Sequence, residues 1–150
     1  MAIDVEKTVL IRRGRADVAA YMFDPANDAA WTSGVVASRP LTGGLLQAGS
    51  RVERTTRFLG REFGYVYYVV DADKDRFVEI RVDKPFPMQA RYQLDDATGG
   101  TRVRIRARGE AGGFFRLAGP LLALMVGRSI AADLDNLRRE LERDAARARP

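Results

Sequence analysis

The sequence of 150 residues predicts an α+β fold, in which an antiparallel sheet of about seven strands packs against one long C-terminal helix. Two observations predict it. Short segments in which apolar and polar side chains alternate follow one another between residues 35 and 109, separated by turn signals. After Gly113 the apolar residues change to helical spacing and keep it to about Ala145. No repeat or linker interrupts this order, so residues 1–150 are expected to form a single domain with a frayed tail over 144–150.

The chain is expected to begin with a strand and two short helices. Residues 5–13 alternate and are rich in β-branched side chains, which indicates the first strand. Residues 15–35 change to a helical period, with Val18, Tyr21 and Met22 on one face. Pro25 interrupts this helix, so a second short helix is expected to end near Gly34.

Five or six strand segments follow, and charge pairs predict the register of three hairpins. The segments are 35–41, 50–58, 61–70, 76–83, 87–95 and 101–109. The turns between them place Arg57 opposite Glu62, Glu79 opposite Arg91, and Asp95 opposite Arg102. Each pair joins opposite charges on one face, which is worth about 0.2–1 kcal/mol.

In the same registers the opposite face of the sheet is apolar, because Leu94 meets Val103, Tyr92 meets Ile105, and Ile80 meets Ala90. The meander therefore has a charged outer face and an apolar inner face. The outer face carries an arginine ladder made of Arg102, Arg104, Arg106 and Arg108. This ladder is a candidate nucleic-acid surface, but no aromatic residues interleave with it, so a solvated face partly neutralised by Glu6, Glu79 and Asp95 is favoured.

The composition excludes several classes of function. The chain has no His and no Cys, which excludes disulfides, Cys/His metal sites and imidazole-based catalysis, and no metal or other cofactor is expected. The formal net charge is +5, but the arginines are spread along the chain. This spread favours a general preference for arginine over a site for nucleic acid or membrane.

The sequence also gives no sign of export or of a membrane span. The segment MAIDVEKTVLIRR lacks the basic and apolar regions of a signal peptide. The apolar run 113–127 is shorter than the ~20 residues that a spanning helix needs. It is also interrupted by Arg116 and Pro120. We therefore expect a cytoplasmic protein.

The long helix changes character along its length. Its second half carries a stripe of large apolar side chains at helical spacing, namely Ile130, Leu134, Leu137 and Leu141. Projected backwards, the stripe reaches Gly127 or Val126, then Ala123 and Gly119. Small residues either allow two backbones to approach closely or leave room for something else. The second explanation predicts a dry cavity lined by Phe114, Phe115, Leu122, Met125 and Val126. Both explanations stay open at this point.

Three stretches carry a resemblance to a known family. They are VEKTVLIRRGRADVAAYMFDPANDAAW, in which Trp31 closes the second short helix, GGTRVRIRARGE as the last strand, and ADLDNLRRELE near the end of the helix. From about residue 3 to 145 the chain resembles the START-like superfamily with the helix-grip fold, and within it the bacterial polyketide cyclase/dehydrase-like proteins. The resemblance implies a pocket between the concave sheet face and the C-terminal helix. It implies no particular reaction, because members include aromatase/cyclases, lipid carriers and hormone receptors.

One charged residue is expected on the inner face. The hairpin register turns Arg54 inward, where a guanidinium needs a partner because an unpaired buried charge is costly. Three partners are open: an acidic group of a ligand, Asp24 or Asp28 from the short helices, or solvent at the pocket mouth. The other candidate ligand-binding residues are apolar or uncharged and are expected around the same pocket. They are Trp31, Thr56, Phe58, Tyr65, Tyr67, Phe86, Tyr92, Phe115, Ala123 and Val126.

The sequence therefore indicates a protein that binds a hydrophobic small molecule, such as a lipid or polyketide with an acidic or oxygenated end. Two alternatives stay open. One is a polyketide cyclase or aromatase acting in the same cavity, for which Asp24 or Asp28 would have to supply a general base. The other is an interaction protein that uses the basic outer face or the small-residue stripe. No nucleic-acid partner is expected, and the protein is expected to be a monomer or homodimer.

Overall fold

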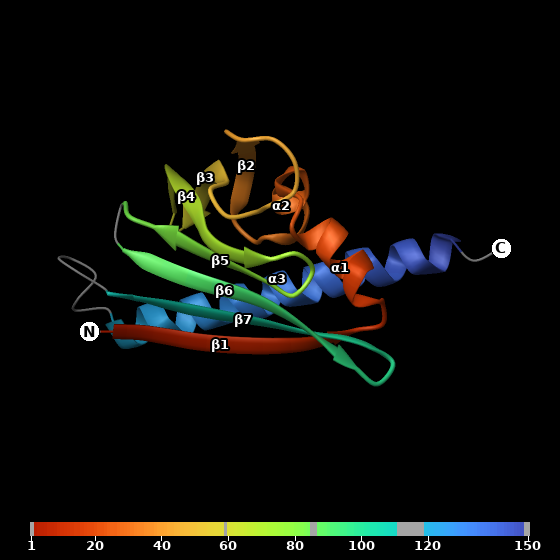
Figure 1. Ribbon diagram of the computed structural model, residues 1–150. Helices are drawn as coiled ribbons and strands as arrows, with labels where there is room; N and C mark the ends of the chain where they lie inside the picture. Colours follow the sequence, from red (N-terminus) through yellow and green to blue (C-terminus); the bar gives the residue numbers. More distant parts are fainter. Residues whose placement is uncertain (1, 59, 85–86, 111–118, 149–150) are drawn as a thin grey trace.

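The computed structural model describes residues 2–58, 60–84, 87–110 and 119–148 (Figure 1). Within them, seven strands form one antiparallel sheet in the order β1-β7-β6-β5-β4-β3-β2, so that β1 and β2 are its edges. The strands are β1 (Ala2–Ile11), β2 (Val35–Pro40), β3 (Arg51–Phe58), β4 (Arg61–Asp73), β5 (Phe77–Val82), β6 (Met88–Ala97) and β7 (Gly100–Glu110). The helices are α1 (Arg15–Met22), the 3-10 turn η1 (Pro25–Asn27), α2 (Asp28–Trp31) and α3 (Gly119–Ala148). The predicted α+β class and strand number are confirmed.

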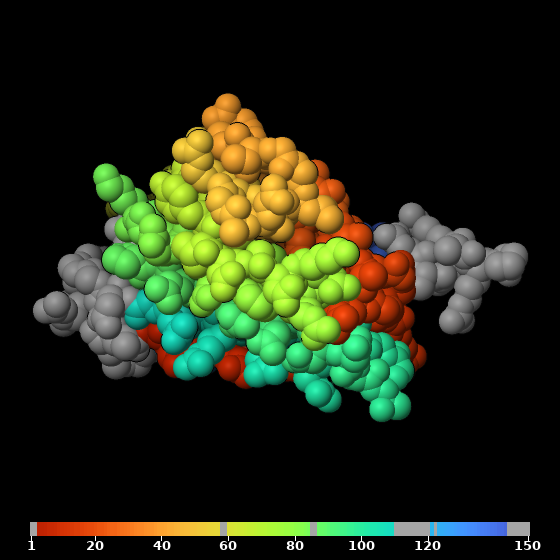
Figure 2. Space-filling view, in the orientation of Figure 1, coloured from red at the N-terminus to blue at the C-terminus, as the bar shows by residue number. Residues whose placement is uncertain are grey.

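The sheet curves around α3, which runs along one of its faces (Figure 1). Figure 2 shows the other face, where β4 to β7 lie side by side and hide most of the described part of α3. The core lies between the inner face and the helices. Its largest fully buried side chains include Met22, Phe23, Trp31, Tyr67, Leu94, Leu134, Leu137 and Leu141. The stripe predicted on the long helix is thus the part of α3 that enters the core.

The hairpin registers are those that the charge pairs predict. Arg57 pairs with Glu62, Glu79 with Arg91, and Asp95 with Arg102. The apolar pairs Leu94–Val103, Tyr92–Ile105 and Ile80–Ala90 are also confirmed. Charge pairing and apolar alternation agree at these hairpins, and a shift of one residue would turn every buried side chain outward.

The element boundaries differ most at the ends of the chain. The first strand is Ala2–Ile11 instead of 5–13, because its pairing with β7 runs from Ala2 to Ile11. The last helix begins at Gly119 in the described residues, and Pro120 lies in its first turn, where proline leaves no intrahelical hydrogen bond unmade. The expected helix start after Gly113 falls in 111–118, outside the described residues.

The arginine ladder lies on the outer face, opposite the buried residues of β7, and three of its members are ion-paired. Arg104 lies 3.1 Å from Asp95, Arg106 lies 2.7 Å from Asp4, and Arg108 lies 4.0 Å from Glu79. These exposed pairs are each worth little to stability. They leave a face of mixed charge rather than a continuous basic surface.

Candidate functional site

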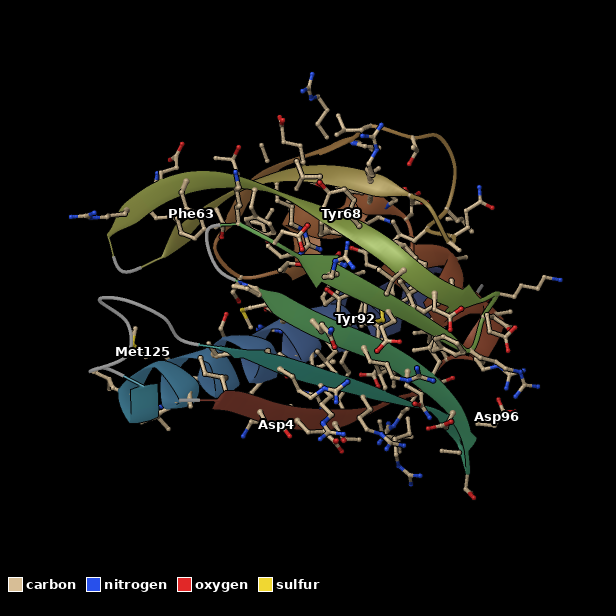
Figure 3. The ribbon with its side chains drawn as sticks, turned by 60° about the vertical axis from the view of Figure 1, so that its left-hand side comes forward. Asp4, Phe63, Tyr68, Tyr92, Asp96 and Met125 are labelled. Carbon is tan, nitrogen blue, oxygen red and sulfur yellow. The ribbon has the colours of Figure 1, made fainter. Side chains whose placement is uncertain are left out.

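A cavity of about 650 Å³ lies between the inner face of the sheet and the first half of α3. Its wall comes from β3 to β7, from the turn between α2 and β2, and from α3. Most of the lining is apolar and includes Val35, Phe63, Ile80, Val82, Met88, Ala90, Ile105, Ala107, Met125, Val126 and Ile130. In Figure 3, Phe63 on β4 and Met125 on α3 lie at the same end of the molecule, and Tyr92 on β6 lies nearer the middle. A concave, mainly apolar space of this kind is typical of small-molecule sites.

The cavity exists because α3 lies against one edge of the sheet. The main contacts of α3 are with β1 and α2. A Cβ atom on Gly127 would lie 3.3 Å from Cγ1 of Val5 and 3.4 Å from Cε of Lys7, so glycine lets the helix approach β1 closely. Ala123 packs nearby in the cluster around Ile3. Close approach therefore explains these small residues, and the space opens over the middle strands, on the side of α3 where Val126 lines the wall.

A buried ion pair closes one side of the cavity. Arg54 on β3 is 4% exposed and Asp28 on α2 is 1% exposed. The Nε atom of Arg54 donates a hydrogen bond of 3.0 Å to Oδ2 of Asp28. The same oxygen accepts hydrogen bonds from the hydroxyls of Tyr67 at 3.2 Å and Ser38 at 3.1 Å. Of the three partners open for Arg54, the structure shows Asp28, whereas Asp24 caps η1 instead.

The guanidinium of Arg54 keeps further hydrogen-bond donors beside the cavity. Its Nη1 atom donates a long hydrogen bond of 3.4 Å to the hydroxyl of Tyr65. Its Nη2 atom lies 3.0 Å from Oδ2 of Asp28, but within the described residues it completes no hydrogen bond, since its N–H bonds do not point at that oxygen. The ring of Tyr67 stacks under the guanidinium, with its centroid 4.5 Å from Cζ.

The surroundings keep Arg54 charged and Tyr67 and Tyr92 neutral. Burial by itself would lower the pKa of Arg54, but Tyr65, Tyr92 and Asp28 together raise it well above its usual value. Burial raises the pKa of Tyr92 to about 12 and raises the pKa of Tyr67 further. The hydroxyl of Tyr92 on the cavity wall can therefore donate or accept hydrogen bonds near neutral pH.

Asp133 on α3 is a carboxyl group on the cavity wall, and it was not among the residues predicted from the sequence. It is 8% exposed, and its Oδ1 atom accepts a hydrogen bond from the backbone N–H of Ser33. Burial raises the pKa of Asp133 to about 6, although the hydrogen bond from Ser33 acts in the opposite direction. The sequence does indicate that this side chain is buried, because Asp133 lies three residues after Ile130 and four before Leu137, on the stripe that the helix buries.

The raised pKa of Asp133 predicts a pH-dependent stability. The folded protein holds this proton more tightly than the unfolded chain does, so the contribution is fully present below the unfolded pKa of about 4 and lost as the pH rises through about 6. The loss is about 3 kcal/mol at most, from a shift of roughly two pKa units. Denaturant unfolding across this pH range should show the decline in the wild type and not in Asp133→Asn. Parallel pH profiles of the two proteins would contradict this assignment.

The structure places the sequence-predicted candidates in three groups. Arg54, Thr56, Tyr65, Tyr92 and Val126 line the cavity. Trp31 and Tyr67 are buried in the core beside it, where Trp31 and Tyr92 form a T-shaped contact with a centroid distance of 5.9 Å. Ala123 packs towards β1. The side chains of Phe58, Phe86 and Phe115 lie outside the described residues, as do those of Phe114 and Leu122.

The described residues hold no cluster of three or more carboxylate, His or Cys side chains that could bind a metal ion. The same part of the chain contains no helix both long and apolar enough to cross a membrane.

Comparisons with known proteins agree with this architecture. The sequence matches the model of a family described as polyketide cyclase / dehydrase and lipid transport over residues 2–142. No protein with a curated description matches it.

Several solved structures share the fold at low sequence identity. Zhui aromatase/cyclase from Streptomyces sp. R1128 is 19% identical, with a TM-score of 0.82 over 97% of this chain and 96% of that one. TTHA0849 from Thermus thermophilus is 13% identical, with a TM-score of 0.81 over 94% and 98%. A START superfamily protein from Mycobacterium smegmatis is 12% identical, with a TM-score of 0.77 over 94% and 98%. These similarities confirm the helix-grip fold. At such low sequence identities they show the fold alone.

Proposed function

This chain belongs to the polyketide cyclase / dehydrase and lipid transport family, and we propose on that premise that it binds an apolar small molecule in the cavity between the sheet and α3. The observation that carries the proposal is the cavity of about 650 Å³, which has an apolar lining and one buried cluster of polar groups around Arg54. Apolar walls supply affinity, and a few fixed polar groups orient the ligand. Arg54, Thr56, Tyr65, Tyr92 and Val126 are the residues we assign to contact it.

Native mass spectrometry tests the proposal directly. A freshly purified sample that carries a ligand should show an added mass, and this mass should disappear when the protein is denatured. The mass of the adduct then identifies the ligand class. No adduct, together with no thermal shift against a panel of fatty acids, ketones and aromatic polyketides, would contradict binding in the cavity.

Filling the cavity should prevent binding without unfolding the protein. Ala107 on β7 lies beside its cross-strand partner Ala90 on β6, and both line the cavity. The substitution Ala107→Phe places a ring in this space and should lower ligand affinity by about tenfold or more, roughly 1.4 kcal/mol. The matched control is Ala37→Phe on the exposed edge strand β2, which should leave affinity unchanged. Thermal shift with a bound ligand measures both, and equal losses in the two variants would argue against this site.

A second candidate function, a cyclase acting on a reactive polyketone, is favoured by Asp133. A general base works best when its pKa lies near the working pH, and burial raises the pKa of Asp133 to about 6 in the wall that also holds Arg54. In this function Arg54 would donate a hydrogen bond to the ketone oxygen of the substrate while Asp133 removes a proton from the adjacent carbon. Mass-spectrometric product analysis should then show turnover that Asp133→Asn abolishes while binding is retained. Binding without any turnover in the wild type would exclude it for the substrate tested.

A further inference from the structure

The buried charges on the cavity wall are balanced without a ligand. The guanidinium of Arg54 carries one positive charge, and the carboxylate of Asp28 carries one negative charge 3.0 Å away. Above its pKa, Asp133 on the cavity wall adds a second buried negative charge. The described side chains buried around the cavity therefore sum to zero or to one negative charge, and hold no unpaired cation.

Two buried polar atoms on the cavity wall nevertheless lack a hydrogen-bond partner among the described residues. They are Nη2 of Arg54 and the hydroxyl oxygen of Thr32. A buried polar group without a partner is costly, so such groups are normally satisfied by protein, water or ligand. Arg54 can only donate, which means that the ligand atom facing it must be an acceptor.

We infer that Asp28 makes this cavity select a ligand that presents an uncharged oxygen, such as that of a ketone or ester, over one that presents a carboxylate or phosphate. The inference rests on the proposed function and names the polar end of its ligand. An uncharged acceptor satisfies Nη2 of Arg54 and leaves the ion pair balanced. An anion would share one guanidinium with Asp28 and would bring an uncompensated charge out of water.

The other groups that face Arg54 do not change this balance. Tyr67 on β4 and Tyr92 on β6 stay neutral because burial raises their pKa values, and Tyr65 on β4 offers a hydroxyl to Arg54. The field of Asp133 on α3 has the same sign as that of Asp28. Two further arginines line the cavity, but both are exposed. Arg57 is paired with Glu62, and the side chain of Arg128 on α3 is exposed to solvent. Charges in water are screened and compensate a buried anion poorly.

A pair of probes of equal size tests the inference. Methyl nonyl ketone and decanoate have similar numbers of heavy atoms, and they differ in a methyl ketone against a carboxylate. Calorimetric titration of the wild-type protein near neutral pH should show the ketone binding at least about tenfold more tightly. As the pH falls from about 8 to about 5, decanoate should bind more tightly while the ketone is unaffected, since Asp133 and the probe both take up protons.

The variant Asp28→Asn tests the cause of the preference. It keeps the shape of the side chain and an acceptor oxygen for Arg54 but removes the negative charge. The affinity for decanoate should therefore rise at least about tenfold relative to the affinity for the ketone. The control Asp24→Asn removes one charge from the cap of η1 and should leave the ratio unchanged. Circular dichroism verifies that both variants fold. The pH series on the wild-type protein tests the preference for the ketone even if a variant does not fold.

The outcomes separate this inference from the proposed function. Decanoate binding to the wild type as tightly as the ketone overturns the selectivity while leaving a ligand-binding cavity. An unchanged ratio in a folded Asp28→Asn protein overturns the role of Asp28. Binding of neither probe, with no adduct in native mass spectrometry, overturns the proposed function and this inference with it.

Discussion

Replacing Asp28 with alanine should lower the free energy of unfolding by about 3–5 kcal/mol, because it leaves the guanidinium of Arg54 buried without a counter-ion. Oδ2 of Asp28 also accepts hydrogen bonds from Tyr67 and Ser38, and both donors would lose their partner. Denaturant unfolding monitored by the fluorescence of Trp31 measures the effect.

A double variant shows whether the loss comes from the stranded charge. Removing both members of a buried ion pair is often far less costly than removing one. Asp28→Ala combined with Arg54→Met should therefore recover most of the stability that Asp28→Ala loses. Equal losses in the single and double variants would mean that packing at α2, and not the charge of Arg54, is responsible.

The second large effect is expected at Gly100, the first residue of β7. A Cβ atom there would collide with the backbone carbonyl oxygen of Ile11, at the end of β1. Because backbone atoms cannot rotate away as a side chain can, Gly100→Ala should cost about 2–4 kcal/mol by forcing β1 and β7 apart. Thermal or denaturant unfolding provides the measurement.

Gly14 offers a matched control for this substitution. It precedes α1 with φ of −65°, and no described atom lies within 4 Å of the position of its Cβ. Gly14→Ala should therefore change stability by only about 0.5 kcal/mol. A similar loss in both variants would point to the general effect of replacing glycine rather than to a close contact at Gly100.

The sheet was predictable from the sequence because its evidence is local. Arg57 and Glu62 flank one turn, and so do Asp95 and Arg102, so each hairpin carries its own register. The inward position of Arg54 follows from the same local rule. Its partner could only be narrowed to a few possibilities, since Asp28 lies on α2, and the packing of that helix over β3 is not encoded in either segment alone.

The cavity was less predictable for a similar reason. Small residues in the first half of α3 fitted both close packing and an open space, and the choice depends on which edge of the sheet the helix contacts. Gly127 lies against Val5, so α3 settles on β1 and the space forms on its other side. Asp133 falls on the same stripe, but the spacing of large apolar residues gives no reason to expect a carboxyl group on the cavity wall.

The pairing of β1 with β7 has a consequence for how the chain folds. Lys7 lies opposite Ile105, because β1 at the start of the chain pairs only with β7, the last strand. The helix α3 then packs on β1 as well. During synthesis the hairpins from β3 to β7 can form in turn as they leave the ribosome, while β1 waits until β7 has emerged. Contacts of such long sequence separation slow folding. Until β7 has been synthesised, β1 is an unpaired strand that can pair wrongly with a neighbouring chain.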